Sequence, residues 1–550
     1  MTGIATPVNL PAAATSGTVT GPGGTMLVFE VVIALLLGGA ALAAVARRVG
    51  APYPALVALA GAALAMVPGV PTLVLDPELA LALFVAPVLV DAAFDSSQRD
   101  LRANWRPIAS LALGAVALTV VVVAAVARLL VPDMPWAVAI ALGAIVAPPD
   151  AAAATTVLKA LRPPHRLLTI LEGESLFNDA SALLIYRLAV GAAMAGALSA
   201  ASVVPTLLVV TVGSVVLALA LSRVTLWLTA RIDDVSTAVV LQFCSTFLVW
   251  ILAERLHLSG IITMVVYAMA ASRRAAELVP ARIRVPAWAV WEVAVFVLNV
   301  LAFVLVGFQL RSIAARATGA TGAEYALVAV AATAAAIAAR IAWVTLAAGV
   351  GRFRRRHDAP GGRPAGVGLG TREAAVVGWC GMRGTVTLAA ALALPTAFPY
   401  RDLILTTAFG VTLGTLVAQG LTLRPLMLRL RLEDDGAVER EVRLARVETL
   451  RAGLAAAHAA PDAESASLVR HRYALQLRRV ERETTDGDGA ALDDAVVRSA
   501  TGAQRERLVA LRADGTIGDA AFQRVEEELD WAEMDWARYL RAGGPEDGRA

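Results

Sequence analysis

The sequence predicts an all-α polytopic membrane protein with about 13 transmembrane helices, arranged as inverted repeats, and a helical C-terminal tail. Hydrophobic residues make up 58% of its 550 residues and charged residues only 17%, and the mean hydropathy is +0.68. An average soluble domain has about 25% charged residues. Most of this chain is therefore too apolar to fold in water.

Charged residues divide the chain into a membrane part and a polar tail, because they are sparse up to the end of the apolar runs and dense from Arg431 onward, and the first 25 residues are small, polar and free of basic residues. We expect an N-terminal tail at residues 1–25, a membrane domain at 26–430 and a mostly helical polar tail at 431–550. Met1 and Met26 are both candidate translation starts. The net charge of +3 is too small to indicate binding to nucleic acid.

Apolar runs long enough to cross about 30 Å of hydrocarbon as a helix define the expected spans. In chain order they cover residues 26–46, 53–68, 78–94, 106–130, 136–157, 167–190, 203–228, 235–255, 259–272, 287–309, 325–349, 374–395 and 403–424. The second and the ninth are short for a span.

Basic residues in the loops predict the direction of these spans. They gather in alternate loops, such as those with Arg47 and Arg48, with Lys159 and Arg166, and with the arginines of 352–356. Cytoplasmic loops carry the excess of lysine and arginine. We therefore expect the N-terminus outside the cell and the C-terminal tail in the cytoplasm.

Ionisable residues inside the third and fifth spans break the rule that spans are apolar, at about 2.5–3.5 kcal/mol each on insertion scales. Asp91 lies about one turn inside the cytoplasmic end of the third span, as an ion ligand or as a capping carboxylate. In the fifth span, Pro148 and Pro149 precede Asp150. Proline removes a backbone donor and clashes with the preceding turn, so the helix should break there. A simple proline kink is the alternative.

The sixth span carries a row of oxygen-bearing side chains. At 100° per residue, Glu172, Ser175 and Asp179 share one helical stripe, and Glu174 and Asn178 form the adjacent one. Carboxylate, hydroxyl and amide oxygens are the hard ligands that a small alkali cation needs once its water is removed. The stripe predicts a cation path that ends at Asp179, the deepest of these groups.

The twelfth span has glycines around Arg383. Small residues alone are common where membrane helices pack closely, but a guanidinium at this depth needs a carboxylate partner, and we expect Glu174 or Glu172. Arg340 in the eleventh span is expected to extend toward the cytoplasmic surface. Glu292 in the tenth span is placed outside the site.

The two irregular segments lie in the fifth and the twelfth spans. If spans 1–6 and 8–13 are repeats joined by span 7, the second repeat crosses the membrane in the opposite sense and the breaks are equivalent. Inverted repeats with discontinuous helices that meet at the midplane are typical of secondary transporters.

Four segments resemble one family of transporters. They are Glu172-Gly-Glu-Ser-Leu-Phe-Asn-Asp179, Gly381-Met-Arg-Gly384, Trp291–Asn299 and Phe303–Gln309. They resemble the sodium/proton exchangers of the monovalent cation:proton antiporter-1 family, in the same order along residues 26–430. The resemblance implies the sodium/proton antiporter fold, with a six-helix core domain and a dimerisation domain, working as a homodimer among the lipids of the cell membrane.

The resemblance also implies roles for individual residues. Asp179 would bind the cation and the proton in turn, and the other cation-site residues would be Asn178, Asp150, Ser175 and Asp91. Glu174 and Arg383 would form a structural ion pair. One monovalent cation, Na⁺ before all others, would exchange electroneutrally for one H⁺ in pH homeostasis, without a cofactor and without an enzymatic reaction.

Two departures from the family pattern bear on the choice of cation. The chain has Pro149-Asp150-Ala151 where the family has Thr-Asp-Pro, and Asp91 where glutamate is usual. Exchange of K⁺ or Li⁺ for H⁺ is therefore an alternative. A membrane sensor that signals through residues 436–550 is an alternative of another class. Hydrolase, phosphate-loop, zinc and ATP motifs are absent from the sequence.

Overall fold

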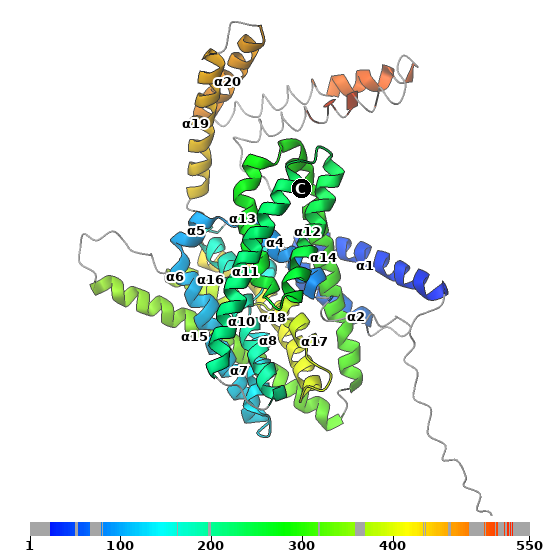
Figure 1. Ribbon diagram of the computed structural model, residues 1–550, viewed down its shortest axis with the longest axis vertical. Coiled ribbons are helices and arrows are strands. Elements are labelled where there is room, and N and C mark those ends of the chain that lie inside the picture. The colour runs from blue at the N-terminus through cyan, green and yellow to red at the C-terminus, as the bar shows by residue number, and fades with distance from the viewer. Residues whose placement is uncertain are drawn as a thin grey trace, which may run out of the picture. The chain divides into compact units, whose positions relative to one another are not determined.

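Long apolar runs form helices throughout the described part of the chain (Figure 1). The structure is a computed structural model, and it describes residues 22–49, 53–65, 79, 81–161, 163–195, 200–316, 319–357, 369–432, 434, 436–459, 464–482, 500, 502–511, 513–514, 522, 525–526, 528–529 and 531. The expected N-terminal tail lies outside these residues up to residue 21. Two compact units result, Met1–Glu433 and Asp434–Ala550.

The first unit contains most of the helices. They are α1 (Pro22–Val49), α2 (Tyr53–Ala65), the π-helical η1 (Leu81–Val85), α4 (Ala86–Asp95), α5 (Gln98–Ala103), α6 (Trp105–Ala109), the π-helical η2 (Ser110–Ala115), α7 (Val116–Leu130), α8 (Trp136–Val146), α9 (Ala151–Leu161), α10 (His165–Ala195), α11 (Ala200–Thr229), α12 (Val235–Arg255), α13 (Gly260–Leu278), α14 (Ala281–Arg316), α15 (Gly319–His357), α16 (Thr371–Trp379), α17 (Thr385–Leu392) and α18 (Arg401–Leu430).

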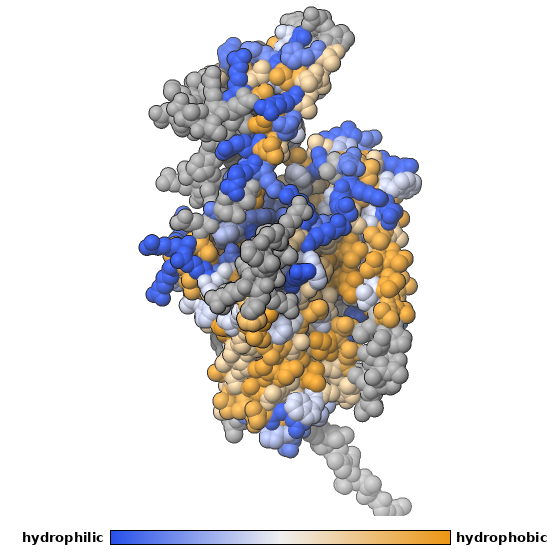
Figure 2. All heavy atoms as spheres, turned by 90° about the vertical axis from the view of Figure 1, so that its left-hand side faces the viewer, coloured by the Kyte–Doolittle hydropathy of each residue, from blue (hydrophilic) through white to orange (hydrophobic). Residues whose placement is uncertain are grey.

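The apolar surface of this unit is that of a membrane protein. Among the described residues, seven helical segments are long and apolar enough to span a membrane, and they are Trp105–Leu130, His165–Met194, Leu208–Thr229, Val235–Arg255, Ala281–Val304, Gly322–Gly351 and Arg401–Leu430. Figure 2 shows a broad belt of hydrophobic side chains on one face. Exposed leucines and valines such as Leu113, Val121 and Val330 belong to this apolar surface. The predicted all-helical membrane fold is confirmed.

Two of the predicted spans are broken helices. α8 ends at Val146 and α9 begins at Ala151, with Pro148 and Pro149 in the gap. α16 ends at Trp379 and α17 begins at Thr385. The discontinuous helices expected in the fifth and twelfth spans are therefore confirmed.

The helices pack in two groups around separate apolar cores. The first group, named here the carrier bundle, contains α7–α10 and α15–α18, and its core also receives residues of α2 and α14. The second group, named the scaffold bundle, contains α4 and α11–α13. Leu176 of α10 belongs to the core of the scaffold bundle, and Val386 of α17 packs against it, so α10 and α17 of the carrier bundle both contact the scaffold bundle.

The second unit contains a helical hairpin. α19 (Ala437–Ala459) packs on α20 (Glu464–Arg482), and Gly453 of α19 lies against the ring of Tyr473 of α20. The exposed side chains of the two helices include charged residues and also large apolar ones such as Leu444 and Leu468.

Candidate functional site

The two broken helices touch each other at their gaps. The backbone N–H of Asp150 donates a hydrogen bond to the carbonyl of Met382, at 2.7 Å. In return, Nε of Arg383 donates to the carbonyl of Val146, at 2.6 Å. Because each gap supplies partners for polar groups of the other, non-helical backbone becomes tolerable deep inside the protein.

The place where the two gaps meet is named here the crossing. Its charged side chains complement the partial charges of the four helix ends that lie there. Asp150 immediately precedes α9, and its carboxylate lies so close to Gly384, the N-cap residue of α17, that a Cβ added there would overlap it. The carboxylate therefore lies at two helix N-termini, where partial positive charge favours an anion. Arg383 donates to Val146 at the end of α8 and, through Nη1, to Gly381 just after α16, at 2.8 Å. Its cation thus lies at two C-termini.

α10 supplies the third side of the crossing. The hydroxyl of Ser175 accepts a hydrogen bond from the backbone N–H of Ala151, at 3.4 Å, at the start of α9. Nδ2 of Asn178 donates to the carbonyl of Pro149, at 3.0 Å. This bond fixes the orientation of the amide and leaves Oδ1 of Asn178 buried without a hydrogen-bond partner in the described structure.

Asp179 is also buried, with 6% of its surface exposed, and it lies within electrostatic reach of Asp150. The structure therefore brings four of the predicted cation-site residues, Asp179, Asn178, Asp150 and Ser175, to one place. Three of them carry oxygens that suit a small cation: two carboxylates and the unpartnered amide oxygen of Asn178. Within the described residues, no three His, Cys, Asp or Glu side chains converge as ligands of a metal ion.

The predicted ion pair between Glu174 and Arg383 is wrong. Glu174 pairs instead with Arg340 of α15, through two hydrogen bonds of 2.5 and 2.8 Å. Both side chains are almost fully buried, and Nε of Arg340 donates to the carbonyl of Val377 in α16. The expected extension of Arg340 toward the cytoplasmic surface is wrong for the same reason. Arg383 is held by backbone carbonyls because broken helices expose them.

Glu172, the other expected partner of Arg383, is half-exposed and lies 3.6 Å from Nζ of Lys159. Glu172 of α10 therefore lies beside the end of α9 and not at the crossing. Its place follows from the turn between α9 and α10, which returns the chain so that Lys159 faces the first turns of α10.

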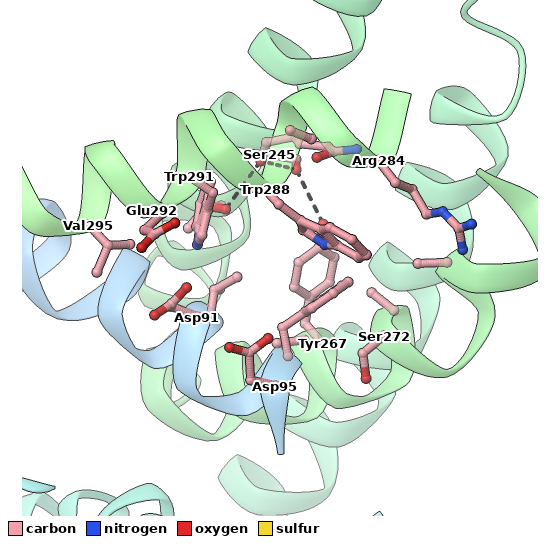
Figure 3. Close-up of a pocket in the computed structure, with 18 of the residues that line it drawn as sticks. Asp91, Asp95, Ser245, Tyr267, Ser272, Arg284, Trp288, Trp291, Glu292 and Val295 are labelled. Atoms are coloured by element: carbon pink, nitrogen blue, oxygen red, sulfur yellow. Dashed lines mark hydrogen bonds between the residues drawn. The ribbon is translucent and has the colours of Figure 1, made fainter. Parts of the chain in front are cut away.

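Asp91, the remaining predicted cation-site residue, lies apart from the crossing in a cavity of about 730 Å³. The cavity lies between α4, α11–α13 and α14. Figure 3 shows the carboxylates of Asp91 on α4 and Glu292 on α14 pointing into the same space, with Asp95 one turn further along α4. Glu292, which the sequence predicted to lie outside the site, lies in this cavity, and so does Asp95, for which the sequence predicted no role. The spacing of Asp91 and Asp95 by one helical turn was the available signal.

Tyr53 of α2 connects this cavity with the crossing. It lines the cavity together with Asn299 of α14, and it lies within electrostatic reach of Asp150. The cavity thus extends from a group of three carboxylates to the neighbourhood of the broken helices. A cation that enters it meets negative charge along its way.

The fold and the sequence match known cation/proton exchangers. The profile of the family "Sodium/hydrogen exchanger, transmembrane" matches residues 31–429. An uncharacterized Na⁺/H⁺ exchanger of Mycobacterium tuberculosis is 30% identical over 534 residues, which are 94% of this chain and 97% of that protein. A sodium, potassium, lithium and rubidium/H⁺ antiporter of Bacillus subtilis is 31% identical over 62% of this chain and 53% of its own.

A solved structure shares the fold. The sodium proton antiporter MjNhaP1 of Methanocaldococcus jannaschii superposes with a TM-score of 0.56 at 16% identity, covering 74% of this chain and 99% of that one. With the family profile over most of the membrane unit and a 30% identical relative along nearly its whole length, this chain belongs to the sodium/hydrogen exchanger family.

Proposed function

We propose that this protein exchanges Na⁺ for H⁺ across the cell membrane, one for one and without net charge movement, with Asp179 as the carrier of both ions. The observation that carries the proposal is the pair of oxygens at adjacent positions of α10. The carboxylate of Asp179 and the unpartnered Oδ1 of Asn178 are buried where two broken helices cross. A dehydrated cation fits such a site because, within the described part of the chain, no cation pairs with Asp179 and no donor reaches Oδ1 of Asn178.

Competition for one carboxylate couples the two fluxes. Asp179 holds either a cation or a proton. After it releases one ion on one side of the membrane, it must bind the other ion before the carrier bundle moves back. The other groups fix the geometry: Asn178 and Ser175 hold the gap between α8 and α9, and Arg383 neutralises the helix C-termini there. Alternating access then requires movement of the carrier bundle against the scaffold bundle.

The cavity with Asp91, Asp95 and Glu292 is the proposed approach to the site from the cytoplasm. This assignment follows the orientation expected from the basic loops, with the N-terminus outside and the tail in the cytoplasm. We further propose that the protein works as a homodimer. The tail from residue 434 onward is proposed to regulate transport rather than to carry out its ion exchange.

K⁺ is the second candidate cation. The chain has Pro149 where the family has a threonine, so one hydroxyl ligand is missing from the gap. The Bacillus subtilis relative is named for sodium, potassium, lithium and rubidium. A site with fewer short-range ligands discriminates less between small and large cations, which is why K⁺ belongs in every assay.

The test is proton flux in proteoliposomes after addition of Na⁺, Li⁺ or K⁺. Asp179→Asn is expected to abolish exchange with every cation, whereas Asp133→Asn, in the exposed turn before α8, should leave exchange unchanged. Clamping the membrane potential should not alter the rate if exchange is electroneutral. Cation-dependent proton flux in the Asp179→Asn variant would overturn the assignment of the carrier.

A further inference from the structure

The ion pair between Arg187 of α10 and Glu254 of α12 connects the carrier bundle to the scaffold bundle. Nη2 of Arg187 donates to both carboxylate oxygens of Glu254, at 3.0 and 3.1 Å. Glu254 is itself positioned by α13, because its Oε1 accepts a hydrogen bond from the backbone N–H of Gly260, at 3.3 Å. The carboxylate of Glu254, near the end of α12, therefore lies at the N-terminus of α13, where partial positive charge favours it.

Arg187 lies on the face of α10 that meets the scaffold. Leu176, Ala180 and Leu183 pack on the scaffold core, and with Arg187 they follow the i, i+4, i+7, i+11 spacing of one helical stripe. The opposing surface of α13 is also apolar, with Ile261, Met264 and Val265 buried there. Such a contact can slide, because apolar packing has little directionality. The ion pair adds a specific attachment at its end.

The ion pair lies at the start of α13, whereas the large cavity is lined by the second half of that helix. Gly260 begins α13, and the residues of α13 that line the cavity run from Tyr267 to Ala275. At 1.5 Å per residue they lie about 10 to 22 Å from Gly260 along the helix. On α10, Arg187 lies about 12 Å beyond Asp179. The carrier residue is thus located between an open cavity on one side and a charged attachment on the other.

We infer that Arg187 and Glu254 form a gate that closes the site on the side away from the cavity. The inference rests on the proposed exchange by alternating access. In the conformation described here the gate is closed and the cavity is open. To expose Asp179 on the other side, α10 must move along the scaffold, and Arg187 must then leave Glu254. Both are positioning residues, since they act on access to Asp179 and do not bind the transported ion.

The first test joins the gate covalently. Arg187→Cys with Glu254→Cys is treated with a methanethiosulfonate cross-linker that a reductant can remove. Exchange should fall to the level of protein-free liposomes and recover on reduction. The matched control is Asp233→Cys with Arg282→Cys, at an exposed ion pair between the α11–α12 turn and α14, where cross-linking should leave exchange intact. Normal exchange in the cross-linked gate variant would overturn the inference.

The second test weakens the gate without a covalent bond. Glu254→Gln should favour the opposite conformation, so the apparent KM for Na⁺ should rise on the cavity side and fall on the gate side. Each shift should be up to about fivefold, the range for a partly exposed ion pair. The exchange of charges, Arg187→Glu with Glu254→Arg, should restore both values in part, because an arginine at position 254 cannot accept the hydrogen bond from Gly260. A lower maximal rate with unchanged KM on both sides would mean a structural role and contradict the gate.

These outcomes separate the gate from the proposed function. If the unmodified protein shows no cation/proton exchange, the proposed function fails. If the unmodified protein exchanges normally and the cross-linked gate variant does so too, only the gate fails.

Discussion

Breaking the buried ion pair between Glu174 and Arg340 should destabilise the protein strongly. Glu174→Gln removes the carboxylate and keeps the shape, so the guanidinium of Arg340 stays buried without a counter-charge. Their exposed fractions are 1% and 2%. Removal of one partner of such a pair costs about 3–5 kcal/mol. We therefore expect a large fall in the apparent melting temperature of the purified protein.

Glu172→Gln is the matched control, because Glu172 lies on the same helix and also pairs with a cation. Its pair with Lys159 is 36% and 67% exposed, and exposed pairs contribute about 0–1 kcal/mol. The assay is the fraction of monodisperse protein that remains after heating in detergent. Equal losses in the two variants would refute the reasoning. A double variant with Glu174→Leu and Arg340→Met should regain much of the stability, because apolar replacements leave no buried charge.

Three further predictions concern the crossing and a helix terminus. Gly384→Ala should abolish exchange because its Cβ would overlap the Asp150 carboxylate, whereas Gly378→Ala, whose Cβ would meet neighbours at an ordinary 3.7 Å, should retain exchange in the same proton-flux assay. Arg383→Met should destabilise by about 1–3 kcal/mol for each buried carbonyl that loses its donor, measured by thermal stability; a neutral result would contradict its role at the helix C-termini. Asp234 is the N-cap of α12, and hydrogen bonds from Thr237 hold the pKa of its carboxyl below the ordinary value. The ionised cap therefore stabilises the folded protein at neutral pH, and this stabilisation is lost as the pH falls through the lowered pKa. The stability difference between Asp234→Ala and the unmodified protein should therefore shrink toward acid pH, and a constant difference would count against the cap.

The helices and their breaks could be predicted because each has a local cause. An apolar run longer than the hydrocarbon thickness specifies a span without knowledge of its neighbours. Pro148 and Pro149 interrupt the fifth span by removing backbone donors, and the clustered glycines around Arg383 weaken the twelfth. The repeat argument predicted that the two breaks are equivalent, whereas the common site of Asp150 and Asp179 was implied by the family resemblance alone. The spans and their breaks can be predicted without knowing which side chains pair with each other.

The partner of Glu174 could not be predicted in the same way. Arg340 lies in α15, a continuous helix with no break and no motif, and its pairing depends on which helices adjoin α10 and at what rotation. Arg383 was the more conspicuous arginine, but its hydrogen bonds go to carbonyls that exist only because two helices are broken. The free carbonyls of the broken helices thus bind Arg383, which the sequence pattern had paired with a carboxylate.

Glu292 shows a second limit of sequence reasoning. An acidic residue within a span can be recognised from the sequence, but its role depends on the direction in which its side chain points. The cavity that Glu292 shares with Asp91 forms between α4 and α14, which are far apart in the sequence. Only the packed structure brings the two carboxylates into one space.

The central claim is that one carboxylate, that of Asp179, serves both ions in turn. The most direct measurement is the apparent KM for Na⁺ of the unmodified protein in proteoliposomes as a function of pH on the same side. In the acid range, the account predicts that KM rises about tenfold for each unit of falling pH while the rate at saturating Na⁺ stays constant, since one proton competes with one cation. A KM that does not change with pH, together with a falling maximal rate, would mean separate sites and contradict the account.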